Sequence, residues 1–91
     1  MPRVDYSERA LGDLNAIYSY ITEDSIDIAE AVLESILDVV KMLERAPRAG
    51  RLRLEHGSDI RTVPVYPFIV FYRSLKADSV VQVLRVIAAV A

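Results

Sequence analysis

The 91-residue chain is long enough for one domain and too short for a second independent core, and its 53% hydrophobic content excludes a disordered chain. It has no cysteine and a single histidine, which excludes disulfides, a thiolate nucleophile and most cysteine or histidine metal sites. No apolar run approaches the roughly 20 residues of a membrane span, and the N-terminus lacks a signal-peptide pattern. We therefore expect one cytoplasmic domain over residues 1–91, without a metal or other cofactor and without membrane contact.

The net charge of −2 conceals a strong asymmetry between the two halves of the chain. Up to Glu44 there are three basic and ten acidic residues, a net charge of −7; from Arg45 onward there are eight basic and three acidic residues, a net charge of +5. Charges act locally, within a Debye length of about 8 Å at physiological salt. The C-terminal half therefore presents either a basic recognition surface or an ordinary solvated basic face opposite an acidic one.

Two amphipathic helices are predicted in the N-terminal half. The first begins after Ser7, a favourable N-cap, and ends near Thr22; apolar residues recur along it at helical spacing, namely Leu11, Leu14, Ile17, Tyr18 and Ile21. The second begins after an N-cap at Asp27 or Ser25 and is stopped by Pro47, with Gly50 in the exit. Its apolar stripe contains Ile28, Ala29, Val32, Leu33, Ile36, Leu37, Val40 and Leu43. The short connection predicts an antiparallel helical hairpin.

After Gly50 the apolar period changes from helical to alternating. Strands are predicted at Ile60–Val65, Phe68–Ser74 and Ser79–Val90, and a short first strand at Val4–Tyr6. Tight connections between the last three strands predict an antiparallel meander. The expected fold is α+β: a short N-terminal strand, then a helical hairpin packed on a C-terminal three-stranded β-meander.

Arginines on these strands are the main candidates for function. Strand alternation places Arg73 in a row with Ile69 and Phe71, and Arg85 in a row with Val81, Val83 and Ile87; the pattern is compatible with either row facing the helices. Arg61, Arg73 and Arg85 lie one on each strand, and Arg51 and Arg53 lie in the exit from the second helix. They could form one patch that binds nucleic acid or an acidic peptide, or each could extend to solvent or pair with a nearby acid.

The remaining polar and aromatic candidates carry weaker signals. His56 lies in a polar loop with no acid–base partner in sequence, so we expect a solvated rather than a catalytic histidine. Tyr66 and Tyr72 could stack on bases or donate hydrogen bonds, although strand tyrosines more often pack. Tyr6, Tyr18 and Tyr20 are predicted to line the interface between hairpin and sheet.

The order of elements and motifs resembles the ParE/RelE superfamily, the toxins of bacterial type II toxin–antitoxin pairs. The matching pieces are Ala10-x-x-Asp13-Leu14-x-x-Ile17-x-x-Tyr20-Ile21, Ala29 with Ile36 and Leu43, Pro47-x-x-Gly50-Arg51, Arg61-x-x-Pro64-Val65-x-x-Phe68, Tyr72-Arg73 and Val83-Leu84-Arg85-Val86. They run through nearly the whole chain. The Pro-x-x-Gly-Arg and Tyr72-Arg73 pieces are more similar to the ParE branch than to the RelE branch.

This resemblance implies a toxin that is wrapped by a cognate antitoxin in a hetero-oligomer and that acts in plasmid stabilisation or a related system. ParE-like members inhibit DNA gyrase without being enzymes, whereas RelE-like members cleave mRNA on the ribosome. The target-binding candidates that it implies are Arg51, Arg53, Arg61, Tyr72, Arg73 and Arg85. An exposed apolar groove on the hairpin is expected to receive the antitoxin, and an unpartnered chain could self-associate through it.

The chain departs from the nuclease members of the family at two places. Those members carry a basic residue at the position of Ile69, and their last strand continues into a histidine and a basic tail where this sequence reads Ala88-Ala89-Val90-Ala91. Phosphoryl chemistry needs an acid or base and cations that stabilise the charge of the transition state. The sequence therefore favours a non-enzymatic gyrase inhibitor. The alternatives are a ribosome-dependent endoribonuclease and an attenuated toxin that only binds its antitoxin.

Overall fold

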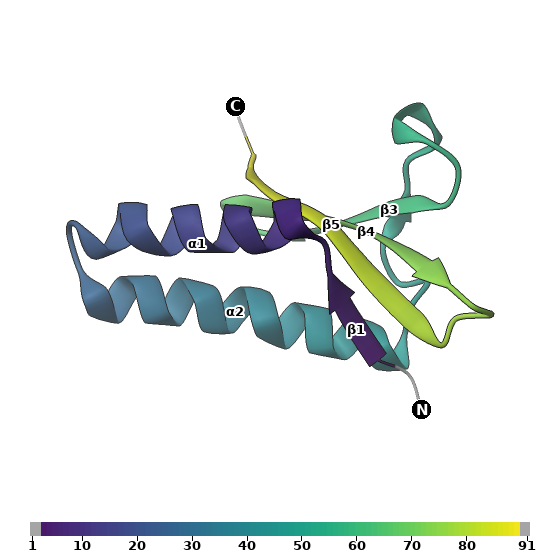
Figure 1. Ribbon diagram of the computed structural model, residues 1–91, viewed down its shortest axis with the longest axis horizontal. Coiled ribbons are helices and arrows are strands. Elements are labelled where there is room, and N and C mark those ends of the chain that lie inside the picture. Colours follow the sequence, from purple (N-terminus) through teal and green to yellow (C-terminus); the bar gives the residue numbers. More distant parts are fainter. Residues whose placement is uncertain (1–2, 90–91) are drawn as a thin grey trace.

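The computed structural model describes residues 3–89 and has two layers, a helical hairpin and a twisted sheet (Figure 1). The elements in chain order are β1 (Arg3–Tyr6), α1 (Glu8–Thr22), α2 (Ile26–Arg45), β2 (Arg51–Leu52), the short 3₁₀ helix η1 (Leu54–His56), β3 (Ile60–Val65), β4 (Phe68–Leu75) and β5 (Val80–Ala88). The predicted α+β class and the order of its elements are confirmed. Val90, predicted to end the last strand, lies outside the described residues.

Both helices begin at a serine cap. The Oγ of Ser7 accepts a hydrogen bond from the Ala10 amide at 3.0 Å, and the Oγ of Ser25 accepts one from the Ile28 amide at 3.1 Å. Ser25 is therefore the N-cap of α2, and Asp27, the other candidate, lies in the first turn, where a negative charge is favourable. In residues 3–89 no helix is both long enough and apolar enough to cross a membrane.

The sheet has five strands in the order β1-β5-β4-β3-β2. The predicted antiparallel meander forms its centre, as β3, β4 and β5. Two short strands extend it: β2 pairs with β3, and β1 pairs in parallel with the first half of β5. Because β1 pairs with residues 77 positions further along the chain, no local sequence pattern predicts this pairing.

The hairpin packs on one face of the sheet, here called the inner face. Its core joins Ala10 and Leu14 of α1 and Ile36 and Val40 of α2 to Val70, Val83 and Val86 of the sheet. The predicted apolar stripes of the two helices are wider than the buried faces, because Leu11, Ile28 and Leu37 are exposed. Tyr20 is also exposed, so its predicted place at the hairpin–sheet interface is wrong.

A β-bulge in β5 changes which residues share a face. Phe71 lies opposite Arg85 and Tyr72 lies opposite Val83, so Leu84 is an extra residue. Val83 therefore faces the helices, whereas Arg85 points to the other side of the sheet, here called the outer face. The predicted continuous row from Val81 through Arg85 to Ile87 is wrong, because strand alternation holds only up to the bulge.

Candidate interaction surfaces

Four of the six predicted target-binding residues belong to the outer face. Cross-strand pairing places them there. Arg73 lies opposite Ile60, and Arg85 lies opposite Phe71. Arg51 lies opposite Thr62, which is itself opposite Phe71. Arg53 joins them because its Nε donates a hydrogen bond to Thr62 Oγ1 at 3.0 Å. Within residues 3–89, Arg51 and Arg73 form no ion pair, and the buried Nε of Arg73 has no acceptor.

Arg61 and Tyr72 lie opposite each other on the inner face and have an internal role. Tyr72 is fully buried; its hydroxyl donates to the Pro47 carbonyl at 2.7 Å and accepts from the Gly50 amide at 2.8 Å. Burial raises the pKa of this phenol, so the hydroxyl keeps the proton that it donates. Because Tyr72 is inaccessible to a target in this structure, its prediction as a target-binding residue is wrong.

Arg61 completes the same connection between hairpin and sheet. Its guanidinium donates to the Gly50 carbonyl at 2.9 Å and to the Arg48 carbonyl at 3.3 Å. The segment from Pro47 to Gly50 has few backbone partners of its own, so Arg61 and Tyr72 supply them. The predicted patch of Arg61, Arg73 and Arg85 is therefore not one surface.

Arg85 is fixed by Asp13 of α1, a residue that sequence reasoning did not select as part of the site. The Asp13 carboxylate accepts from Arg85 Nε at 2.7 Å, from Arg85 Nη2 at 2.9 Å and from the Val86 amide at 2.9 Å. The hydrogen bonds from Arg85 hold the pKa of Asp13 below its ordinary value, with the Val86 amide adding to the effect. The residues are 72 positions apart, so only the quoted helix motif containing Asp13 hinted at its importance.

Asp13 also completes the edge of β5 where β1 ends. The amide of Ser7 donates to the Val83 carbonyl at 2.9 Å, and the Ser7 hydroxyl donates to the Leu84 carbonyl at 2.9 Å. The Val86 amide is next along this edge and is taken by Asp13. The start of α1 thus replaces a strand along the exposed edge of the sheet.

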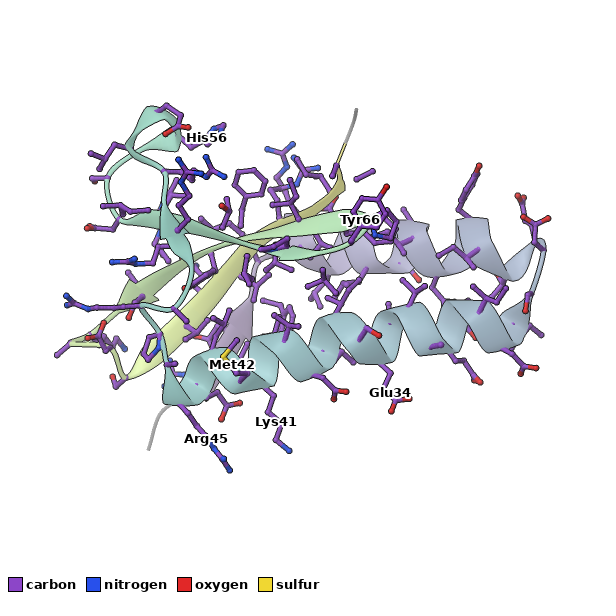
Figure 2. All side chains as sticks on the ribbon, turned by 180° about the vertical axis from the view of Figure 1, so that it is seen from behind. Glu34, Lys41, Met42, Arg45, His56 and Tyr66 are labelled. Carbon is purple, nitrogen blue, oxygen red and sulfur yellow. The ribbon has the colours of Figure 1, made fainter. Side chains whose placement is uncertain are left out.

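An apolar pocket lies on the outer face beside Arg85. This outer pocket has a volume of about 280 Å³ and is lined by His56, Ile60, Phe71, Leu84, Arg85 and Ile87. The His56 ring packs edge-on against Phe71, with ring centres 5.2 Å apart and planes at 86°. Figure 2 shows His56 on the loop that projects from the sheet. Among residues 3–89 no three histidine, cysteine or acidic side chains gather as a metal site would require.

A larger apolar groove lies at the closed end of the hairpin, at the edge of the inner layer. Its main part has a volume of about 620 Å³ and is lined by Ala16, Ile17, Tyr20, Ile21, Ile28, Val32, Pro67, Phe68 and Ala88. A neighbouring pocket of about 190 Å³ shares Ile28 and Val32 and adds Ala31, Ser35, Val65 and Tyr66. We call the two parts together the hairpin groove. It contains the two most exposed aromatic side chains, Tyr20 at 75% and Tyr66 at 90%.

The α+β domain therefore carries an open apolar groove at the closed end of the hairpin and several arginines on the outer face of the sheet. The family described as "ParE toxin of type II toxin-antitoxin system, parDE" matches residues 4–89, and the chain belongs to this family of toxins. It is 34% identical over 88 residues to Toxin ParE3 of Caulobacter vibrioides, covering 96% of this chain and 86% of that protein.

Solved structures agree with this assignment. The chromosomal ParDE toxin–antitoxin system from P. aeruginosa gives a TM-score of 0.79 at 25% identity, covering 99% of this chain and 98% of that one. The RelBE2 toxin–antitoxin complex from Mycobacterium tuberculosis gives a TM-score of 0.72 at 22% identity, covering 97% and 99% of the two chains, and supports the fold alone. These structural relatives were determined as parts of toxin–antitoxin systems.

Proposed function

We propose that this toxin is a ParE-like inhibitor of DNA gyrase, that it acts by binding rather than by catalysis, and that a cognate antitoxin silences it. The observation that carries the proposal is the apolar centre of the outer face, where Ile69 lies opposite Ile87. RNA cleavage would need an acid or base together with cations around the scissile phosphate. Isoleucines cannot supply either, and His56 contacts a phenyl ring rather than an acid–base partner.

Reconstituted DNA supercoiling by gyrase tests this target. We expect supercoiling to fall when the purified toxin is added in micromolar excess, and to recover when the antitoxin is added before the toxin. The same preparation should leave mRNA on stalled ribosomes uncut. Normal supercoiling at that excess would contradict the gyrase proposal, and cuts in the ribosomal A site would favour the endoribonuclease alternative.

For the antitoxin, the hairpin groove is the surface that we propose as its docking site. The groove is open and largely apolar, and its two parts lie side by side along α2, as a surface for one face of an amphipathic helix requires. Binding would cover Tyr20, Ile28 and Tyr66, which are exposed in the toxin alone. A hetero-oligomer formed in this way leaves the outer face free of the antitoxin helix.

Replacing Ile28 by aspartate should separate antitoxin binding from toxicity. Ile28 lines both parts of the groove and is 57% exposed, so a carboxylate there weakens an apolar contact without unfolding the toxin. We expect antitoxin affinity to fall at least about tenfold, since burial of one isoleucine side chain is worth that much. Isothermal titration calorimetry measures the affinity.

Ile26→Asp is the matched control for this test. Ile26 is 60% exposed at the start of the same helix but does not line the groove. Its antitoxin affinity should stay within about twofold of the wild type, because a surface substitution away from the contact is nearly neutral. Equal losses in the two variants would place the antitoxin elsewhere on the toxin.

A further inference from the structure

The outer pocket combines apolar walls with a guanidinium at its rim. Ile60, Leu84 and Ile87 supply aliphatic surface, Phe71 supplies an aromatic one, and Arg85 is the charged member of the lining. The bulge at Leu84 is what places two adjacent residues, Leu84 and Arg85, in the same lining. Since the helices cover the inner face, the pocket remains accessible when the hairpin groove is filled.

Two further cations lie near this pocket, in addition to Arg85, whose own charge is paired with Asp13. Arg73 lies two residues after Phe71 on the same face of β4 and has no ion pair within residues 3–89. Arg53 is held in place by Thr62, the cross-strand neighbour of Phe71, and its one acidic partner among residues 3–89, Glu55, lies 3.9 Å away and is largely solvated. A distant, exposed pair of this kind screens little of the positive field.

The chemistry of the walls decides between two kinds of anionic partner. Single-stranded nucleic acids are held by open aromatic platforms on which bases stack, together with hydrogen bonds to base edges. Here the one phenyl ring in the lining already packs against the His56 ring at 86°, and three of the six lining residues are aliphatic. Aliphatic walls with a charged rim fit an apolar side chain whose neighbours are acidic.

We propose that the outer pocket receives an apolar side chain from an acidic segment of the toxin's protein target. This inference rests on the proposed function in one respect, that the toxin acts by binding a protein. In the complex, the apolar side chain fills the space between His56 and Ile87. Carboxylates on either side of it then pair with Arg73 and with the solvent-facing edge of Arg85.

A direct test uses synthetic pentapeptides and the intact toxin. The probe has the sequence Glu-Asp-Phe-Asp-Glu with blocked ends; one control replaces its phenylalanine by alanine, and the other replaces its four acids by lysines. Amide chemical shifts of a ¹⁵N-labelled toxin should change around Phe71 and Ile87 with the probe. We expect the alanine peptide to bind roughly tenfold more weakly, and the lysine peptide to cause no shift at these amides.

Two pocket variants and one control variant make the test specific to the pocket. Ile87→Glu adds a carboxylate at the pocket and should weaken the probe by roughly tenfold through lost apolar contact and charge repulsion. The matched control is Met42→Glu, a comparably exposed residue on α2 away from the loop of His56, which should bind as the wild type does (Figure 2). Arg73→Gln, which removes only a charge, should weaken the probe by about threefold at low salt. Unchanged antitoxin affinity verifies that each variant is folded.

The gyrase assay separates failure of this inference from failure of the proposed function. If Ile87→Glu and Arg73→Gln both bind the probe and inhibit gyrase as the wild type does, the pocket proposal is overturned and gyrase inhibition stands. If the probe binds as expected but wild-type toxin does not affect gyrase, the pocket is retained and another acidic protein is its target. A single-stranded RNA oligonucleotide that displaces the probe from the pocket and binds more tightly would overturn the proposal in favour of nucleic acid.

Discussion

Gly50→Ala is expected to lower the free energy of unfolding by about 3 kcal/mol, because a methyl group at this position has no room. An added Cβ would lie 2.5 Å from the Tyr72 hydroxyl oxygen, 2.6 Å from its ring and 2.9 Å from the Thr62 carbonyl oxygen. The ring cannot move aside, since it is fully buried and its hydroxyl is hydrogen-bonded at Pro47 and Gly50. The methyl group therefore breaks the contact that joins the hairpin to the sheet.

Gly12→Ala is the matched control, and its effect should have the opposite sign. Gly12 lies inside α1, and an added Cβ would meet nothing within 4 Å. Alanine is a better helix former than glycine, so we expect the free energy of unfolding to rise by up to about 1 kcal/mol. Urea unfolding followed by circular dichroism measures both variants. Equal effects of the two substitutions on the free energy of unfolding would show that the close contact with Tyr72 does not exclude a side chain at position 50.

Asp13→Ala is expected to lower the free energy of unfolding by about 2–3 kcal/mol at neutral pH, since hydrogen bonds to a charged group contribute more than neutral ones. The substitution leaves the Val86 amide without its acceptor and releases the guanidinium of Arg85. The Asp13 side chain is only 16% exposed, so water cannot fully replace it. Asp13→Asn keeps one acceptor oxygen and should show a smaller loss.

The contribution of Asp13 should also depend on pH in a defined direction. Its pKa is lower in the folded toxin than in the unfolded chain, chiefly because of the hydrogen bonds from Arg85. Its stabilisation is therefore complete above the unfolded value of about 3.9 and is lost as the pH falls through the lower folded value. Urea unfolding of wild type and Asp13→Asn at pH 7, 5 and 3 should show their difference shrinking only at the most acidic pH. A difference that stays constant down to pH 3 would contradict the assigned role of the ion pair.

The sequence alone determined the fold class, the start of α1 and the central meander. Ser7 capped α1 as predicted, because a serine before an amphipathic run satisfies the free amides of the first turn within three residues. The change of apolar period after Gly50 located β3, β4 and β5 to within a few residues. These features depend on neighbours in the chain. The ordered motifs were also sufficient to indicate the toxin family, because they occur in the same order along nearly the whole chain.

Only the tertiary structure decided which candidate residues form a surface together. Strand alternation put Arg85 in the row of Val83, and the bulge at Leu84 reversed it, because one extra residue exchanges the two faces of a strand. Tyr72 and Arg61 were predicted to contact a target, yet both hold the Pro47–Gly50 segment, which lies 11 to 25 positions away in sequence. Pairing between distant segments fixes burial and partner choice, and neither follows from the local spacing of residue types. The arginines were therefore visible in the sequence, whereas the outer pocket that they surround was not.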